Sequence, residues 1–206
     1  MARRKPSQTD HLWQSFKRQS IQQAVIQLMC REGLPSVTMD RVAQEVGIAK
    51  GTIYLHYRDK QELLDDVKHS SLDPMVAKMD EIFHSDALPE KKLQTYSLRY
   101  LTYFDERRDL FRILLYEREV TRVQSSRYQS DRYRHLVDGT AGVIRDGIKK
   151  GIFREIDDAR GMAAMFVESN LTIMNQRITT DSPRPVEDDA QLISGLFIRG
   201  LKRRAR

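Results

Sequence analysis

The sequence contains few of the residues that disulfide-bonded, metal-binding or turn-rich proteins need. Cys30 is the only cysteine, so an intramolecular disulfide and a cysteine-rich zinc site are both excluded. We interpret Cys30 as a small buried thiol, rather than a redox sensor, because it falls in an apolar stripe. With only ten glycines and six prolines in 206 residues, glycine-punctuated β-turns are scarce, and the composition is typical of a helical protein.

Long apolar segments are also missing. No run approaches the roughly 20 apolar residues that span a bilayer, and the N-terminal sequence MARRKPSQTD has no apolar signal-peptide core. We therefore expect a soluble, cytoplasmic protein. The formal net charge of +6 favours polyanionic partners, nucleic acid first and an anionic membrane surface second. The basic residues are dispersed rather than gathered on one amphipathic face, which favours nucleic acid.

Motifs for catalysis and metal binding are absent as well. The histidines form no HxxxH pair, and no G-x-S-x-G, phosphate-binding glycine loop or HExxH occurs. Adjacent carboxylates such as Asp65 and Asp66 diverge by about 100 degrees on a helix, so they do not converge on one site. We predict no enzymatic activity, no cofactor and no metal, and we keep an unfamiliar helical enzyme as the contrasting alternative.

One stretch, residues 37–60 (VTMDRVAQEVGIAKGTIYLHYRDK), carries a specific pattern. It predicts a helix over 39–46, capped by Thr38, and a second helix over about 50–57. Gly47 between them suits a tight turn, because glycine adopts a positive φ without strain from a Cβ. This is the sequence form of a helix-turn-helix, whose second helix enters the major groove of DNA.

The phase of the second helix separates an internal face from an external one. Ile53 and Tyr57 lie one turn apart on the inward side, with Ile48 as an anchor beneath the turn. The outer side presents Thr52, Tyr54, Leu55 and His56 beside Lys50 and Lys60. Such a mixture is unsuited to an ordinary solvated surface and is typical of contact with sugar, phosphate and base edges.

The segment TMDRVAQEVGIAKGTIYLHYRDKQELL resembles the DNA-binding motif of the TetR (tetracycline repressor) family. The match includes T-x-x-x-VA-x-x-VG-I at its start and G-T-I-Y-x-H-Y-x-x-K-x-x-L at its end, without a gap, within roughly residues 18–65. The resemblance implies a three-helix DNA-binding head, a fourth helix that leads into a larger helical body, and a homodimer that usually acts as a ligand-released repressor. Pro74 departs from the continuous connecting helix of the family pattern.

We predict a DNA-binding surface made of Thr38, Lys50, Gly51, Thr52, Tyr54, Leu55, His56 and Lys60. Phosphate contacts would come from Thr38, Tyr54, His56 and Lys60. Lys50 and Thr52 would read base edges, and Leu55 would contact a thymine methyl group. Gly51 would allow close backbone approach, because no side chain holds the helix away. The alternatives are internal partners for Tyr54 and His56, and plain solvation for Lys60.

Helical periodicity along the chain predicts an all-α fold of about nine helices. The expected helices cover residues 11–31, 39–46, 50–57, 61–84, 88–106, 107–123, 125–150, 159–178 and 186–202. We assign residues 1–60 to a helix-turn-helix DNA-binding domain and residues 61–206 to a helical domain for effector binding and dimerisation. Pro74 would cost its helix about 3 kcal/mol unless the helix kinks or restarts there, with Asp73 as the cap of a restart.

Two sets of apolar residues in the body have candidate roles. Tyr96, Tyr100, Phe104, Phe111, Met165 and Phe166 either pack as core or line a cavity for an apolar or aromatic effector. The apolar coat of residues 159–178 is too wide for one core-facing stripe, which favours burial against a second subunit. By resemblance to the family, the dimer interface would come from the last two helices, with Val167, Leu171, Met174, Ile193, Leu196 and Phe197.

The expected protein is therefore a homodimeric transcriptional repressor that binds a palindromic double-stranded operator and is released from it by a small-molecule effector. The alternatives from other classes are a helical enzyme and a basic protein of membrane surfaces, neither of which would have an operator. Residues 1–10 form a basic arm, which either reaches DNA or is a solvated terminus.

Overall fold

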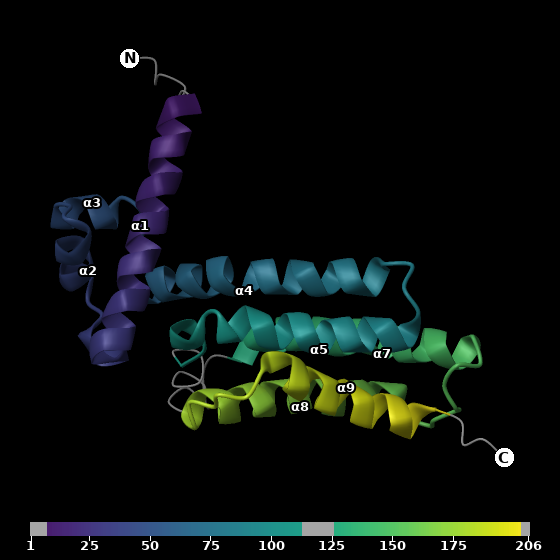
Figure 1. The fold of residues 1–206 in the computed structure, drawn as a ribbon. Helices are drawn as coiled ribbons and strands as arrows, with labels where there is room; N and C mark the ends of the chain where they lie inside the picture. Colours follow the sequence, from purple (N-terminus) through teal and green to yellow (C-terminus); the bar gives the residue numbers. More distant parts are fainter. Residues whose placement is uncertain (1–7, 113–125, 203–206) are drawn as a thin grey trace. The chain divides into compact units, whose positions relative to one another are not determined.

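The computed structural model describes residues 8–112 and 126–202, with side chains over 15–112 and 131–202. These residues are built from α-helices (Figure 1), and the all-α prediction is confirmed. Apart from helices and turns, an isolated β-bridge pairs Phe153 with Lys202. The chain divides into two compact units, Met1–Leu72 and Asp73–Arg206, which we call the head and the body. This division lies twelve residues beyond the predicted boundary at residue 60, inside the fourth helix.

The head contains α1 (Gln8–Glu32), the 3₁₀ turn η1 (Leu34–Ser36), α2 (Met39–Val46), α3 (Lys50–Tyr54) and the first three turns of α4 (Lys60–His84). α1 packs against η1 and α2, and α2 packs against α3. The fully buried side chains at the centre are Ile21, Val25, Leu28, Val37, Val42, Ile53 and Leu63. Residues of α1, α2, α3 and α4 thus share one apolar core, which fixes the position of α3.

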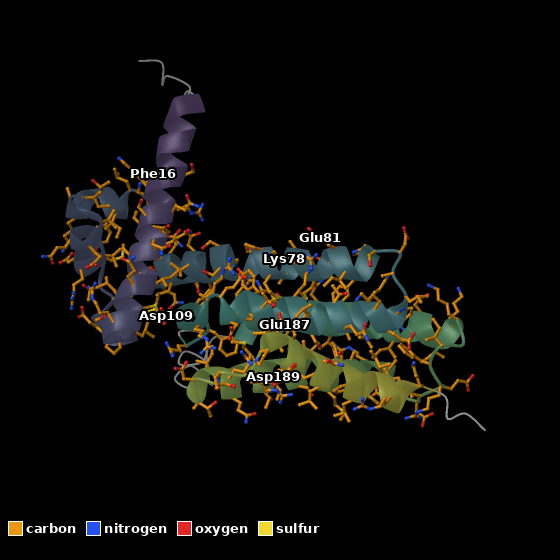
Figure 2. All side chains as sticks on the ribbon, viewed as in Figure 1. Phe16, Lys78, Glu81, Asp109, Glu187 and Asp189 are labelled. Carbon is orange, nitrogen blue, oxygen red and sulfur yellow. The ribbon has the colours of Figure 1, made fainter. Side chains whose placement is uncertain are left out.

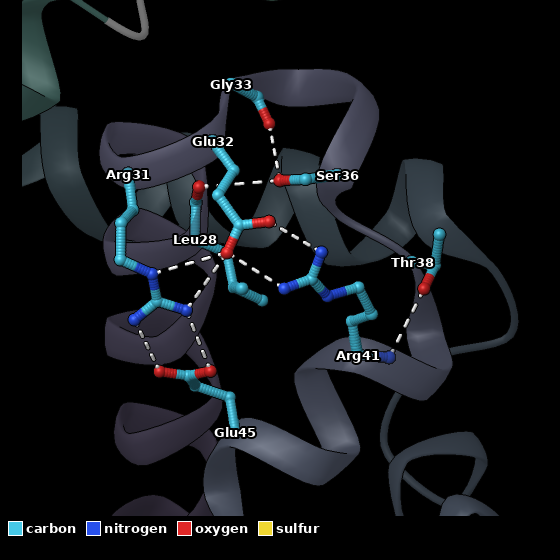
Figure 3. Close-up of polar contacts among 8 residues, drawn as sticks. All are labelled: Leu28, Arg31, Glu32, Gly33, Ser36, Thr38, Arg41 and Glu45. Carbon is cyan, nitrogen blue, oxygen red and sulfur yellow. Dashed lines mark hydrogen bonds and ion pairs between the residues drawn. The ribbon is translucent and has the colours of Figure 1, made fainter.

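The ends of α2 are set by local chemistry. The Thr38 Oγ1 accepts a hydrogen bond of 3.2 Å from the Arg41 N–H, so Thr38 caps the helix as predicted. Gly47 ends it at φ 74°, the left-handed region that favours glycine. Ion pairs of Arg31 with Glu45 and of Arg41 with Glu32 join the end of α1 to α2 (Figure 3). Arg41 is therefore held in an ion pair with Glu32.

Three local predictions, two in the head and one at the start of the body, need correction. α3 ends at Tyr54 and is followed by a turn, so the predicted helix over 50–57 is too long. Cys30 is exposed rather than buried, because the inward side of α1 at this level is taken by Leu28 and Met29. α4 continues through Pro74, so the predicted restart with Asp73 as its cap does not occur.

The body contains the end of α4 together with α5 (Pro89–Asp105), α7 (Ser126–Lys149), α8 (Ala159–Thr179) and α9 (Val186–Leu201). α5 packs against α7, α8 and α9, while α8 packs against both α7 and α9 (Figure 1). Of the predicted helix over 107–123, residues 108–112 are helical, and the remainder lies outside the described residues. None of the described helices is long and apolar enough to span a bilayer.

A buried ion cluster ties together three helices of the body. The Arg177 guanidinium donates to Asp189 at 2.5 Å and to Asp105 at 3.2 Å, and its side chain is only 4% exposed. Asp189 is labelled in Figure 2. Because each charge has an opposite partner, the cluster joins α5, α8 and α9 without leaving an unpaired buried ion.

Candidate DNA-binding surface

α3 and the turn after it have an inner and an outer side. Ile53 is fully buried and Tyr57 is 4% exposed, so both lie in the head's core as their spacing predicts. On the outer side, Leu55 is 83% exposed and Tyr54 is 46% exposed. Thr52 and His56 are half-buried at the edge of this surface. The internal role considered for Tyr54 therefore has no support from its exposure.

Gly51 lies on the outer side of α3 and is not required by the fold. A Cβ placed on it would meet no atom of the chain within 4 Å, and its φ is not positive. Gly139 and Gly147 in α7 differ, since a Cβ there would overlap the rings of Phe83 and Phe153. Glycine at position 51 therefore leaves open space over α3, as close approach of a partner's backbone would need.

Lys50, predicted to read a base, is engaged within the head. Its Nζ lies 2.8 Å from Asp40 Oδ1, and this hydrogen bond raises the pKa of Lys50 above its ordinary value. Both side chains are more than 60% exposed, so the pair is weak and solvent competes with it. Lys50 can therefore reach a base only by leaving Asp40, a partner that the sequence spacing did not indicate.

Thr38 and Lys60 combine structural bonds with remaining donors. The Thr38 hydroxyl accepts from Arg41 N–H, and its own proton can still be donated outward. The Lys60 Nζ donates to the Leu34 carbonyl at 3.1 Å, and partial burial lowers its pKa. Lys60 thus fastens the start of α4 to η1 and is not a plainly solvated lysine. Two of its ammonium protons remain for a phosphate.

A groove of about 810 Å³ borders the outer surface on the side of α1 and α4. It is lined by Ser15, Arg18, Leu55, His56, Tyr57, Glu62, Asp66 and His69. At Asp66 the carboxylate accepts hydrogen bonds from Tyr57, Gln22 and Arg18. The sequence did not indicate this cluster, because Tyr57, Gln22 and Arg18 lie 9, 44 and 48 residues from Asp66 and no helical period connects them to it.

Positive charge is concentrated in the segment that carries this surface. Residues 1–60 contain ten Lys or Arg and five Asp or Glu, so they hold five of the six net positive charges of the chain. The remaining 146 residues are nearly neutral in sum. Because residues 61–72 are acidic on balance, the head (1–72) and the body (73–206) each carry a net charge of +3, and within the head the positive charge is concentrated in residues 1–60.

Five of the six effector candidates form one continuous aromatic chain in the body. Ring centroids are 6.0 Å apart for Tyr96 and Tyr100, 5.0 Å for Tyr100 and Phe104, and 4.9 Å for Phe104 and Phe111. Phe166 joins this chain at 5.3 Å from Tyr96. The sixth candidate, Met165, is 62% exposed and lies apart from this buried chain.

Among the described residues of the body, four neutral polar side-chain atoms are buried without a hydrogen-bond partner. They are Tyr96 Oη, Ser97 Oγ, Thr140 Oγ1 and Asn170 Oδ1. The Asn170 amide nitrogen, by contrast, donates to the Phe166 carbonyl at 2.8 Å. Ser97, Thr140 and Asn170 were not predicted, although isolated polar residues on apolar helix faces are a signal that could have revealed them.

The dimer candidates separate into two groups. Val167, Met174 and Ile193 are at most 4% exposed and belong to the body's own core. Leu171 and Phe197 are half-buried, and Leu196 is 61% exposed. Leu192 and Met165, which were not assigned to an interface, are also exposed, at 48% and 62%. The width of the apolar coat on α8 is therefore largely explained by packing within one chain.

A capped helix, a left-handed glycine and a short exposed helix define the head as a helix-turn-helix module. Residues 21–67 match the model for "Bacterial regulatory proteins, tetR family". The chain is thus similar to the TetR family over residues 21–67, which lie in the head.

Two curated transcription regulators are similar to part of the chain. An HTH-type transcriptional regulator of Staphylococcus aureus is 33% identical over 90 residues, which cover 42% of this chain and 46% of that protein. The HTH-type transcriptional repressor KstR2 of Mycobacterium tuberculosis is 26% identical over 130 residues, 62% of this chain and 64% of the repressor. The chain thus spans about half to two thirds of the length of these curated relatives.

A solved structure shows the same fold over most of the chain. The transcriptional regulator FadR from Bacillus subtilis, in complex with stearoyl-CoA, superposes with a TM-score of 0.73. The match covers 89% of this chain and 98% of FadR at 16% identity. At this identity the likeness concerns the fold alone.

Proposed function

We propose that this chain is a sequence-specific DNA-binding transcription regulator that places α3 in the major groove. The observation that carries the proposal is the outer side of α3, where Leu55 is 83% exposed and Tyr54 is 46% exposed. Exposed apolar groups at a fixed position beside an unobstructed glycine favour a macromolecular partner. The net positive charge of residues 1–60 favours nucleic acid as that partner.

Each group on this surface has a role in the proposal. Thr38, Tyr54, His56 and Lys60 donate to phosphates, and Gly51 lets the DNA backbone approach. Thr52 and Leu55 contact base edges. Lys50 exchanges Asp40 for a guanine or a phosphate when DNA arrives, which its exposed and weak ion pair permits.

The regulator acts as a homodimer on a palindromic operator. Two-fold symmetry in the protein would be matched by half-sites about 34–36 Å apart. Support for a subunit interface on the last two helices comes from the exposed side chains of Met165 on α8 and of Leu192 and Leu196 on α9. These three replace Val167, Met174 and Ile193 as the interface candidates, since the latter are core residues.

A small-molecule effector in the body releases the repressor from its operator. Release requires that the effector bind better to a dimer whose recognition helices no longer match successive grooves. The aromatic chain from Tyr96 to Phe111 supports an effector whose skeleton is apolar or aromatic. The unpartnered Tyr96 Oη and Asn170 Oδ1 favour uncharged polar groups on it, because the Tyr96 hydroxyl can donate to a hydroxyl or a carbonyl and Asn170 Oδ1 can accept from a hydroxyl. FadR, solved with stearoyl-CoA, is a protein of this fold with a bound ligand.

Enzymatic activity has no place in this proposal. The curated relatives are transcription regulators, and residues 21–67 match the model of their family. A membrane-surface role would need basic residues on one amphipathic face, whereas Arg41 of α2, Lys50 of α3 and Arg58 of the turn before α4 are paired with the carboxylates of Glu32, Asp40 and Glu62.

Selection of a binding site from random duplexes, followed by fluorescence anisotropy, tests the proposal. The full chain should enrich a palindrome, and its affinity should fall steeply between 50 and 200 mM salt as counterions cease to drive binding. Failure to enrich any sequence, or binding that does not respond to salt, would remove the regulator function.

Two variants test which residues position the protein on the DNA backbone and which residues read the base sequence. Lys60→Ala should weaken binding to all duplexes about equally, whereas Thr52→Ala should change sequence preference. Because Lys60 also donates a hydrogen bond to the Leu34 carbonyl, thermal unfolding of the Lys60→Ala variant must be measured together with its DNA affinity. Unchanged affinity and sequence preference in both variants would show that the DNA contacts are assigned to the wrong residues.

A further inference from the structure

The Asp66 carboxylate on α4 accepts hydrogen bonds from side chains of two other segments of the head. It accepts 2.5 Å and 2.7 Å hydrogen bonds from Tyr57 Oη and Gln22 Nε2, and 2.8 Å from Arg18 Nε. A second guanidinium nitrogen of Arg18 binds the other carboxylate oxygen. Asp66 is 9% exposed, so one buried anion joins α1, α4 and the segment that follows α3.

The protonation states keep this arrangement charged. Burial by itself raises the pKa of Asp66, but the bonds from Arg18, Tyr57 and Gln22 outweigh it and lower the pKa to about 2. Burial and the neighbouring carboxylate raise the pKa of Tyr57, so the phenol keeps its proton and remains a donor. The Tyr57–Asp66 contact is therefore a charge-assisted hydrogen bond throughout the physiological pH range.

Tyr57 is rigidly connected to the proposed DNA surface. Its backbone N–H and that of His56 both donate to the Ile53 carbonyl at 3.0 Å, which closes the turn around Leu55. The Tyr57 ring fills the core, a task that phenylalanine could perform equally well. What the hydroxyl adds is the bond to Asp66, which anchors the turn at one more point.

We propose that Asp66 and Tyr57 are positioning residues for DNA recognition, in which the carboxylate fixes the turn carrying Leu55 and His56 against α1 and α4. The inference rests on the proposed DNA-binding function. Neither residue touches DNA. Their bond holds the exposed Leu55 at the angle at which α3 meets a base pair, so losing it should reduce specific binding more than non-specific binding.

Tyr57→Phe is the sharpest perturbation, because it removes one oxygen and leaves the ring in the core. We expect operator affinity to fall about tenfold, the effect of one charge-assisted hydrogen bond of about 1.4 kcal/mol. Affinity for a scrambled duplex should change much less. Tyr103→Phe, which removes a phenol oxygen from the body, is the matched control and should bind the operator like the wild type. Urea unfolding of each variant corrects for any loss of folded protein.

A double-mutant cycle with Leu55→Ala distinguishes positioning from plain stability. If Tyr57 acts by placing Leu55, then Tyr57→Phe should cost much less in the Leu55→Ala background than in the wild type. Equal costs in both backgrounds, or an affinity loss that disappears after correction for unfolding, would overturn the inference. Asp66→Asn should show the same coupling to Leu55→Ala as Tyr57→Phe does, if it folds.

The wild type is measured first, so that the two ideas fail separately. If the wild type enriches no operator, the proposed function is wrong and this inference falls with it. If the wild type binds its operator and Tyr57→Phe binds it equally well, only the positioning role is wrong.

Discussion

Replacing Gly51 by alanine should make the head more stable and its DNA binding weaker. The added Cβ meets nothing within 4 Å in the chain, so no atom must move to accommodate it. Gly51 is in helical conformation in α3, where alanine is favoured over glycine because it loses less backbone entropy. The gain should be at most about 1 kcal/mol, since the position lies in the first turn of a short helix.

The effect on DNA binding has the opposite sign. A methyl group on the outer side of α3 would hold the helix away from the DNA backbone and lengthen contacts on both sides of it. Losing one good base or phosphate contact costs about 1–3 kcal/mol, which corresponds to at least a tenfold weaker affinity. Opposite changes in stability and affinity cannot both arise from partial unfolding.

Thermal unfolding and fluorescence anisotropy on the selected operator measure the two quantities. Gly142→Ala is the matched control, because Gly142 is an exposed residue of α7 around which a Cβ also meets nothing within 4 Å. It should raise stability similarly and leave DNA affinity unchanged. If Gly51→Ala binds the operator as tightly as the wild type, the reasoning about close approach is refuted.

Three further predictions concern the turn, the subunit interface and acid stability. Gly47→Ala should lower the free energy of unfolding by about 1–2 kcal/mol, because φ 74° is strained for any residue with a Cβ; an unchanged urea midpoint would contradict this. Leu196→Glu should shift the chain to monomers in sedimentation and weaken operator binding, because it places a charge on the exposed side of α9. Gln191→Glu, which adds the same charge at another exposed position of α9, is the control, and a Leu196→Glu protein that stays dimeric would argue against this interface. The folded-state pKa of Asp66 is lowered from 3.8 to about 2, so its contribution to stability is present above pH 4 and is lost as the pH falls towards 2. Urea unfolding between pH 5 and 2 should therefore show a steeper loss for the wild type than for Asp66→Asn, and parallel curves would count against the ionised network.

Several features of the head could be predicted because they depend on neighbours in sequence. The cap at Thr38 needs only the N–H of Arg41, and the turn at Gly47 needs only a residue without a Cβ. The inward position of Ile53 follows from helical phase once an apolar core is assumed. The same logic overestimated the length of α3, because the phase of apolar residues does not indicate where a helix ends.

Pro74 shows where a local rule could not decide the outcome. The cost of about 3 kcal/mol for proline inside a helix predicts a kink or a restart. α4 nevertheless continues, with Met75, Met79 and Ile82 all buried after the proline. Burial of such side chains contributes about 1.5–3 kcal/mol each, so packing can offset the lost hydrogen bond. That balance requires knowing what the helix packs against.

The sequence by itself therefore determined the all-α class, the helix-turn-helix and the residue types of its outer surface, since these follow from periodicity, capping and turn chemistry within a few residues. The tertiary structure alone decided which side chains have partners. It paired Lys50 with Asp40, gathered Tyr57, Gln22 and Arg18 around Asp66, and enclosed Val167 and Met174 within the chain's own core. These contacts join residues on different helices, and the distance between two helices depends on the packing of the whole unit rather than on any local pattern.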